Sequence, residues 1–371
     1  MYDSLSVQHY RLFERLSVSL SPVTLISGKN NTGKTALIES LFLHASGPRA
    51  AHNALAALNA ARGIQIILSG KQDEQTVWDP FFKDYRNSKP IRIDGRFDGK
   101  QSTVEIAKIG ESFINPSATL PVTTSTSSSQ NYSQSIRVST IHDGVSQDYT
   151  QTVTQQTFAQ PSIGSVSLQV GGQSLQLIPS AQPFISANFL AGRLKALQPD
   201  IAQRYSDLRF LNRQDDLYRA LKAIDPRVRS LELLARDGQS TLHLDVEGQL
   251  MPLSQFGEGM GTVADIISSI YDREVRVVFI DEIENGIHYS VLESLWWNIK
   301  RAARATQTQV IATTHSRECM EAAQAAFSKD ARDMLSLVRL ARKPGDASEI
   351  VATSYDFNEL DTALDLNLDV R

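Results

Sequence analysis

The sequence is poor in the features that mark secreted, membrane-spanning and strongly nucleic-acid-binding proteins. A single cysteine, Cys319, excludes an internal disulfide and fits a reducing compartment such as the cytosol. No apolar run approaches the roughly 18 residues of a transmembrane helix, and the N-terminus lacks the pattern of a signal peptide, so we expect a cytoplasmic chain without a membrane span. Among 371 residues, basic ones (37) do not outnumber acidic ones (41), which disfavours a dominant nucleic-acid-binding surface but not a local basic patch.

A glycine-rich segment, Gly28–Thr35, is the most informative part of the sequence. It reads G-x-x-x-x-G-K-T. The apolar, β-branched run Val23–Ser27 precedes it and predicts a buried strand, and Ala36–Leu43 follows with apolar residues at helical spacing. Because strand, glycine loop and helix form the context in which this motif binds phosphate, the segment predicts a P-loop. The alternative, a glycine turn that binds no phosphate, is disfavoured by the same context.

Each part of the loop has a physical role in holding a nucleoside triphosphate. Gly28 and Gly33 let successive backbone N–H groups face one point, and the helix that begins near Lys34 adds the positive end of its dipole. We expect the Lys34 ammonium to reach the β- and γ-phosphates and to contribute to catalysis, and the Thr35 hydroxyl to ligate Mg²⁺. ATP and Mg²⁺ are therefore the predicted ligands. The residues expected to contact the nucleotide in this segment are Gly28, Asn30, Asn31, Thr32, Gly33, Lys34, Thr35 and Ala36.

A second apolar run, Val275–Glu282, ends in two carboxylates. Such a run is typical of a strand buried on both faces, and acidic residues at its carboxyl end fall in the crevice where α/β sheets bind ligands. We expect Asp281 to orient Mg²⁺ through its water shell, and Glu282 to act as the general base or to polarise the attacking water. This is the Walker B arrangement. A surface acidic pair at a strand end is the alternative.

Two further segments fit the same site by their position. Ser254–Gly259 contains a Ser-x-x-Gly loop ahead of a helix-like run, 27 positions before Asp281; such a loop can hold an anion or serve as an ordinary helix N-cap. His315 lies at the end of a third apolar run, Gln309–Ser316, 34 positions after Asp281. A histidine at a strand end is usually structural, but this one falls where a histidine that senses the γ-phosphate would lie.

The remaining segments predict the frame around these motifs. Three strands are expected within residues 2–27, and a helix over residues 36–62 with an interruption near Gly47-Pro48. Residues 111–182 are rich in serine, threonine and glutamine; disorder is one interpretation, and a β-rich lobe with a flexible tip is the one we favour. Residues 189–226 predict helices. Further strands are expected at Ile64–Leu68, Ile91–Ile93, Thr103–Ile106, Ser165–Val170, Ser174–Ile178, Ser230–Leu234 and Leu242–Val246.

Together these motifs resemble the heads of ABC-type ATPases and, more closely, RecF/SMC-like and OLD-like AAA ATPases of the AAA-fifteen and AAA-twenty-one type. Tyr10-Arg11-Leu12-Phe13 matches the N-terminal strand–aromatic–Arg–x–Phe pattern of this group, and the tracts Asp281–Tyr289 and Thr313–Cys319 look like those of stand-alone bacterial members. The resemblance covers residues 1–45 and 225–345. It implies an α/β P-loop NTPase fold, an ABC-ATPase-like head with a mixed central sheet, an N-terminal antiparallel β lobe and a helical lobe.

The resemblance also implies a mechanism. The chain would hydrolyse ATP to ADP and phosphate as a head-to-head homodimer or larger homo-oligomer. ATP on the P-loop of one subunit would be capped by Ser254, Gly257 and Glu258 of the other, with Ser254 contributing to catalysis. His315 would be the switch histidine, and Glu282 the catalytic base.

The same resemblance divides the chain into four expected segments. These are residues 1–110, the P-loop half of the head with the start of the β lobe; 111–188, a Ser/Thr/Gln-rich β insertion; 189–250, a helical arm and return strands; and 251–371, the half with the signature, Walker B and switch histidine. The Gln-loop of such heads has no firm match, because Gln182 and the tract Phe184–Asn188 both lie in the expected region.

Several functions share this architecture. We favour a switch ATPase that regulates a partner effector, as in phage-defence or toxin–antitoxin-like operons, over a RecF-like DNA-binding repair ATPase, because a basic excess is missing. An ATP-sensing scaffold with negligible turnover and an ABC transporter subunit are further alternatives; the 219-position separation of Thr35 and Ser254 argues against the transporter. Only 26 residues follow Gly345, too few for a TOPRIM domain, so we expect any nuclease, TOPRIM-like or HNH-like, to be a separate chain.

Overall fold

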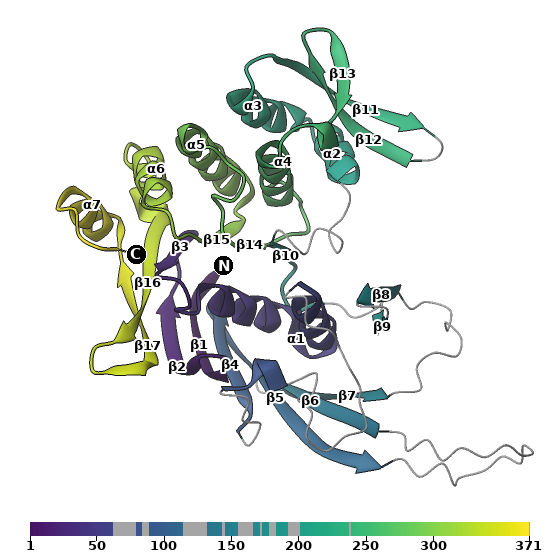
Figure 1. Cartoon of the computed structure of the whole chain (residues 1–371), viewed down its shortest axis with the longest axis vertical. Coiled ribbons are helices and arrows are strands. Elements are labelled where there is room, and N and C mark those ends of the chain that lie inside the picture. The colour runs from purple at the N-terminus through teal and green to yellow at the C-terminus, as the bar shows by residue number, and fades with distance from the viewer. Residues whose placement is uncertain are drawn as a thin grey trace, which may run out of the picture.

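Segments far apart in the sequence meet in one mixed six-stranded sheet (Figure 1). The computed structural model describes residues 1–61, 79–83, 89–113, 132–142, 145–154, 166–170, 173–177, 183–191, 201–236 and 239–370. The strand order is β10-β14-β15-β3-β16-β17, and every neighbouring pair is parallel except β16 with β17. The strands are β3 (Val23–Gly28), β10 (Ala187–Leu190), β14 (Val277–Ile280), β15 (Gln309–Thr313), β16 (Leu335–Lys343) and β17 (Asp346–Tyr355).

The centre of this sheet is apolar throughout. Every residue of β3, β14 and β15 is buried, which is the pattern of parallel strands covered on both faces. Because parallel strands end at the same edge, the segments that follow these three strands come together there. Since β15 lies between β3 and β14, its last residue, Thr313, is placed between the P-loop and the Walker B carboxylates.

The chain up to Thr154 also forms an antiparallel sheet, ordered β2-β1-β4-β5-β6-β7. Its strands are β1 (Tyr2–Tyr10), β2 (Phe13–Ser19), β4 (Ile91–Phe97), β5 (Lys100–Phe113), β6 (Tyr132–His142) and β7 (Val145–Thr154). Buried side chains of the sheet, such as Ile93 and Val104, belong to one core cluster with α1. Strand β5 runs across residues 110 and 111, so the first two predicted segments share this sheet.

Helix α1 (Lys34–Ala61) lies between the two sheets (Figure 1). Its buried Ile38 and Leu41 join one core with Phe279 of β14 and with side chains of the antiparallel sheet. The helix is kinked at Gly47, whose φ is 67°, which confirms the predicted interruption. Helix α1 is therefore anchored on two sides. This anchoring fixes the P-loop, which lies at the N-terminal end of the helix.

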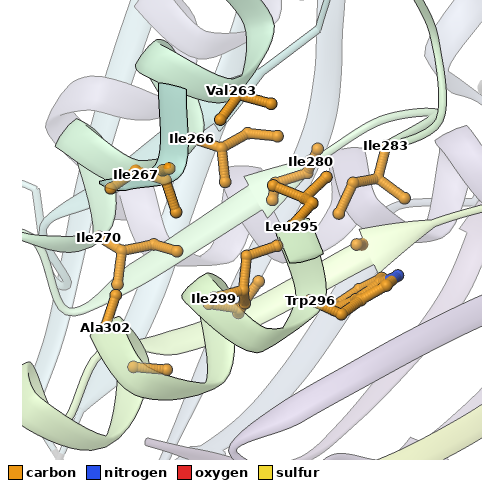
Figure 2. Packing of buried hydrophobic residues seen from close by; sticks show 14 of the residues in the cluster. Val263, Ile266, Ile267, Ile270, Ile280, Ile283, Leu295, Trp296, Ile299 and Ala302 are labelled. Carbon is orange, nitrogen blue, oxygen red and sulfur yellow. The ribbon is translucent and has the colours of Figure 1, made fainter. Parts of the chain in front are cut away.

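The opposite face of the central sheet is covered by helices (Figure 1). These are α4 (Glu258–Ile270), α5 (Tyr289–Thr306), α6 (Arg317–Phe327) and α7 (Phe357–Asp365). Figure 2 shows Ile266 and Ile270 of α4 near Leu295 and Ile299 of α5, with Ile280 of β14 beside them. All five are buried and belong to a hydrophobic core cluster that is distinct from the one containing Ile38 and Leu41 of α1. Short 3₁₀ turns occur at η1 (Asp79–Phe81), η4 (Leu253–Gln255) and η5 (Arg332–Met334).

An arm of two helices and a three-stranded sheet lies beyond α4 (Figure 1). It consists of α2 (Ile201–Phe210), α3 (Gln214–Ile224), β11 (Val228–Arg236), β12 (Gln239–Val246) and β13 (Gln249–Pro252). Buried Arg204 of α2 forms an ion pair with Asp265 of α4 and donates to the Ser268 hydroxyl at 2.9 Å. The arm is thus tied to the helix that follows the predicted signature loop. The hairpin β8 (Val166–Val170) with β9 (Gln173–Leu177) is separate from this arm.

The structure confirms most of the predicted elements and corrects one. The three N-terminal strands are β1, β2 and β3, and the hairpin predicted around residues 165–178 is β8 with β9. Residues 189 and 190, predicted as helical, instead end strand β10. Periodicity cannot separate strand from helix in so short an apolar run, and pairing with β14 decides it. The strand predicted at Ile64–Leu68 lies outside the described residues.

The predicted fold class is confirmed: a P-loop head with a mixed central sheet, an antiparallel β lobe and a helical lobe. In the part of the chain that the structure describes, no helix combines the length and apolarity needed to cross a membrane.

A buried ion pair joins the turn between β1 and β2 to α1. The Arg11 Nε lies 2.8 Å from the Glu39 carboxylate, and their side chains are only 9% and 3% exposed. Arg11 also donates to the Pro80 carbonyl at 3.1 Å and lies over the Phe81 ring. The arginine of the N-terminal motif therefore holds the β lobe to the P-loop helix in this structure.

We expect the change Glu39→Ala to destabilise the fold by about 3–5 kcal/mol, because it leaves the Arg11 guanidinium buried without its carboxylate. The matched control is Glu14→Ala: Glu14 pairs with Lys89 at 3.2 Å, but both side chains are more than half exposed, so the loss there is under about 1 kcal/mol. Urea unfolding of both variants measures the difference. Equal stability of the two variants would contradict the structural role of the Arg11–Glu39 pair.

Candidate functional site

The P-loop has the backbone conformation that its two glycines permit. Gly28 (φ 148°) and Gly33 (φ 93°) lie in regions that favour glycine. A Cβ at Gly28 would approach the Leu340 carbonyl oxygen to 2.5 Å, and a Cβ at Gly33 would approach the Phe13 ring to 2.8 Å. The neighbouring strands leave no room for a side chain at either position. Both glycines are therefore required for the loop to keep this shape.

The other residues of the loop form its rim. Thr32 is buried and donates its hydroxyl to the Lys29 carbonyl at 2.9 Å. Asn30 and Asn31 are exposed, and Arg342 of β16 donates to the Asn31 carbonyl at 3.3 Å. The loop is thus held by its own backbone and by β16, while the side chains of the two asparagines face solvent, where a nucleotide could reach them.

The Lys34 ammonium closes the loop. Its Nζ donates to the carbonyl oxygens of Gly28 at 2.7 Å and Lys29 at 3.0 Å. Partial burial lowers the pKa of Lys34, and the carboxylates that follow β14 act in the opposite direction. A cation held in this way is available to a phosphate group at the loop. Ala36, in the next turn, is buried in the core.

Three segments meet at the Asp281 carboxylate. The Thr35 hydroxyl lies 3.1 Å from both Asp281 carboxylate oxygens, and the Thr313 hydroxyl donates to Oδ1 at 2.7 Å. Burial raises the pKa of Asp281, and the hydrogen bonds from Thr313 and Thr35 act against that shift. The structure therefore brings together Thr35 and Asp281, the two predicted metal ligands, although 246 positions separate them.

The donor set fits Mg²⁺. A hydroxyl and a carboxylate supply the hard oxygen ligands that Mg²⁺ prefers, and this ion usually completes its shell with phosphate oxygens and water. Within the described ranges, no group of three or more His, Cys, Asp or Glu side chains could hold a metal by itself. Thr35 and Asp281 would therefore hold the ion together with the nucleotide.

Glu282 projects from the end of β14 in an uncommon conformation. Its φ is 53°, in the left-handed region that non-glycine residues rarely adopt. The backbone N–H of Glu282 donates to the Thr313 hydroxyl at 2.7 Å, and the Asn285 side-chain amide donates to Glu282 Oε2 at 2.6 Å. The exposed carboxylate is held in place beside Asp281, which suits a group that orients or deprotonates a water.

His315 follows β15 by two residues and lies on the same edge. Its Nδ1 is 2.9 Å from Glu284 Oε1, and its side chain is 51% exposed. The backbone N–H of Thr314 donates to the Ile26 carbonyl of β3 at 2.9 Å, which ties the segment before the histidine to the strand that leads into the P-loop. The predicted switch histidine and the P-loop therefore lie on neighbouring strand ends.

The predicted signature residues differ in how they relate to the P-loop and the Walker B carboxylates. Ser254 is in η4, Gly257 precedes α4 and Glu258 is its first residue, and all three are exposed. No hydrogen bond or ion pair links Ser254 or Gly257 to the P-loop in the described part of the chain. Glu258 lines a small cavity of about 70 Å³ together with Asp281 and Glu282. Within one chain, the N-terminal end of α4 is therefore the part of the signature segment that approaches the Walker B carboxylates.

Sequence reasoning missed three residues that organise this edge. Thr313 bridges the Asp281 carboxylate and the Glu282 backbone, Glu284 contacts His315, and Asn285 holds Glu282. All three lie in tracts that the sequence singled out, but their pairings depend on how strands distant in the sequence are ordered. The Gln-loop stays unassigned: Asn188 lies in β10, and Gln182 falls outside the described residues.

We expect Thr313→Val to lower turnover by roughly 10–100-fold, the usual effect of removing a group that orients a metal ligand. The substitution keeps the shape of the side chain but removes the hydroxyl that contacts Asp281 and Glu282. Thr24→Val is the matched control, because Thr24 is also buried but its hydroxyl bonds near the start of β3, to Ser21. Phosphate release across a Mg²⁺ titration measures both. Normal turnover in Thr313→Val would contradict the bridging role.

The chain is similar in sequence to a curated protein and in structure to solved protein heads. A curated protein of Helicobacter pylori named "ATP/GTP phosphatase" is 23% identical over 336 residues, covering 86% of this chain and 87% of that protein. Among solved structures, an SMC head bound to the C-terminal winged-helix domain of ScpA has a TM-score of 0.49 at 12% identity, covering 98% and 99% of the two chains. The SMC head domain of Thermotoga maritima has a TM-score of 0.43 at 13% identity, covering 96% and 99%.

The family assignment rests on a match over most of the chain. The model of the family described as "AAA domain, putative AbiEii toxin, Type IV TA system" matches residues 23–321. That range contains the P-loop, the Asp281 and Glu282 carboxylates and His315. The chain therefore belongs to this AAA-domain family.

Proposed function

We propose that this AAA-type ATPase is an ATP-hydrolysing switch that works as a homodimer or larger homo-oligomer and regulates a separate effector in bacterial anti-phage defence. One observation carries the dimer: Lys34 and Asp281 lie on one edge of the sheet, whereas Ser254 in η4 is exposed and shares no hydrogen bond with the P-loop among the described residues. Each chain therefore offers two half-sites. The toxin and toxin–antitoxin terms in the family description support the defence role.

The residues on the Walker B edge suit hydrolysis of a nucleoside triphosphate. Lys34 binds the β- and γ-phosphates, and His315 contacts the γ-phosphate. Glu282 accepts a proton from the water that attacks the γ-phosphorus, while the bond from phosphorus to the ADP oxygen breaks. Mg²⁺ held by Thr35 and Asp281 would neutralise negative charge on the phosphates.

A second copy completes the site. The exposed Ser254 hydroxyl, Gly257 and Glu258 stand at the N-terminal end of α4, where the helix dipole favours an anion. Placed against the nucleotide of the other copy, this half-site closes around the γ-phosphate. ATP binding then favours the closed dimer and hydrolysis opens it, so the state of the dimer reports the state of the nucleotide.

The effector is a separate protein that responds to this opening and closing. A TOPRIM-like or HNH-like nuclease is the class we favour, with the complex acting in the cytoplasm and without a membrane. The balance of 37 basic and 41 acidic residues offers no sign that the ATPase itself is the main nucleic-acid-binding partner.

The variant Glu282→Gln is expected to bind ATP but to lose hydrolysis by at least about 100-fold, because the amide cannot accept the proton. It should also accumulate as the closed dimer. Glu293→Gln, an exposed change on α5, is the control. Phosphate release and mass measurement by light scattering with ATP test both statements. Undiminished phosphate release would exclude Glu282 as the base.

A mixing experiment tests whether the site is shared. Lys34→Ala and Ser254→Arg should each abolish hydrolysis alone. A heterodimer of the two has one site that carries both changes and one that carries neither. Random pairing should therefore restore roughly a quarter of the wild-type rate, since about half the dimers have one of two sites intact.

The control mixture is Lys34→Ala with Glu282→Gln. Both changes lie in the same half-site, so neither composite site of the heterodimer is intact and no activity should return. Restoration in the control mixture, or none in the test mixture, would contradict the shared site.

A further inference from the structure

We infer that Glu284 is a positioning residue, which fixes the His315 imidazole for nucleotide hydrolysis. This inference rests on the proposed function, in which His315 contacts the γ-phosphate. Glu284 stands two residues after the proposed base, in the loop between β14 and α5. Neither the motif spacing nor the resemblance assigned it a role.

A single carboxylate oxygen of Glu284 makes two contacts with His315. Glu284 Oε1 accepts the backbone N–H of His315 at 2.8 Å and lies 2.9 Å from Nδ1 of the same residue. The carboxylate is only 10% exposed, whereas the imidazole is 51% exposed. The ring is thus held at Nδ1, while about half of the side chain stays open to solvent.

The loop that carries Glu284 is itself fixed against β15. The backbone N–H of Ile283 donates to the Thr313 carbonyl at 3.1 Å, and the Ile283 side chain is fully buried. Glu282, one residue earlier, donates its N–H to the Thr313 hydroxyl. Because its two preceding residues are held in this way, the backbone position of Glu284 is fixed. Its carboxylate is therefore placed beside His315, in the segment that follows β15.

Only one of the two Glu284 carboxylate oxygens is satisfied, so the carboxylate carries a cost at this position. Glu284 Oε2 is buried and has no hydrogen-bond partner in the structure. An unsatisfied buried oxygen of a charged group costs free energy, and well-packed apolar residues often replace buried ion pairs without loss of stability. A side chain that is retained at such a cost and contacts a proposed site residue is better explained by its action on that residue.

The chemistry of the imidazole shows what the carboxylate would achieve. With Nδ1–H donated to Glu284, Nε2 is the nitrogen that remains for the nucleotide. A phosphate oxygen accepts hydrogen bonds, so recognition through Nε2 needs a proton on that nitrogen as well. Carboxylates that hold the distal nitrogen of a functional histidine have this orienting effect at other sites.

The test compares Glu284→Met with Glu284→Gln. Methionine fills the space without an acceptor, so kcat for ATP hydrolysis should fall about 10–100-fold, with the dissociation constant for ATP and the thermal unfolding midpoint little changed. Glutamine keeps an acceptor oxygen and should give a rate between methionine and wild type. The matched control is Glu321→Met on α6, whose carboxylate pairs with Arg317; it should keep the wild-type rate.

A double variant separates positioning from a general structural effect. If Glu284 acts through His315, Glu284→Met should cause no further loss in a His315→Ala background. Wild-type kcat in Glu284→Met, or the same fold-loss in both backgrounds, would overturn the inference while leaving the switch ATPase intact. Wild-type kcat in His315→Ala would overturn both this inference and the role given to His315 in the proposed function.

Discussion

The hydrogen bonds of one carboxylate, that of Asp281, organise the functional edge of this protein. Thr35 from the P-loop helix and Thr313 from β15 both bond to it. Burial raises the pKa of this carboxylate, and the two hydrogen bonds act against that shift by favouring the ionised form. The same Thr313 hydroxyl accepts the Glu282 N–H. One small network thus joins three chain segments, and the proposed metal site and the proposed base both depend on it.

The strand order makes this network possible. With β15 between β3 and β14, the segment after β15 lies between the P-loop and the Walker B loop. The loop that follows β14 also contacts α4. Gly259, in the first turn of α4, packs so closely against the Gly286 carbonyl that a Cβ would not fit. A movement of α4 on closure of the dimer would therefore reach the loop that holds Glu282 and Glu284.

The sequence predicts much of this edge and little of how its parts interact. Gly28, Gly33 and the apolar strands before the loop and the carboxylates carry local signals, so the P-loop and Walker B positions could be placed. The contact of Glu284 with His315 could not, because it depends on the register of two strands that are paired only in the fold. Strand β10 was misjudged for a related reason: its pairing with β14, and not its own pattern, sets its structure.

If two copies of the chain share each ATP site, cysteines placed on either side of that site should cross-link between the copies. Cys319 is buried, and burial raises the pKa of its thiol to about 12, so it should not compete with introduced thiols. A Lys29→Cys chain, mixed with a Ser254→Cys chain and each in a Glu282→Gln background, supplies one thiol beside the P-loop and one at the signature. A short thiol-reactive linker should yield a cross-linked heterodimer in the presence of ATP and Mg²⁺ and almost none without nucleotide. Absence of this product under saturating ATP, or an equal yield without ATP, would contradict the shared site.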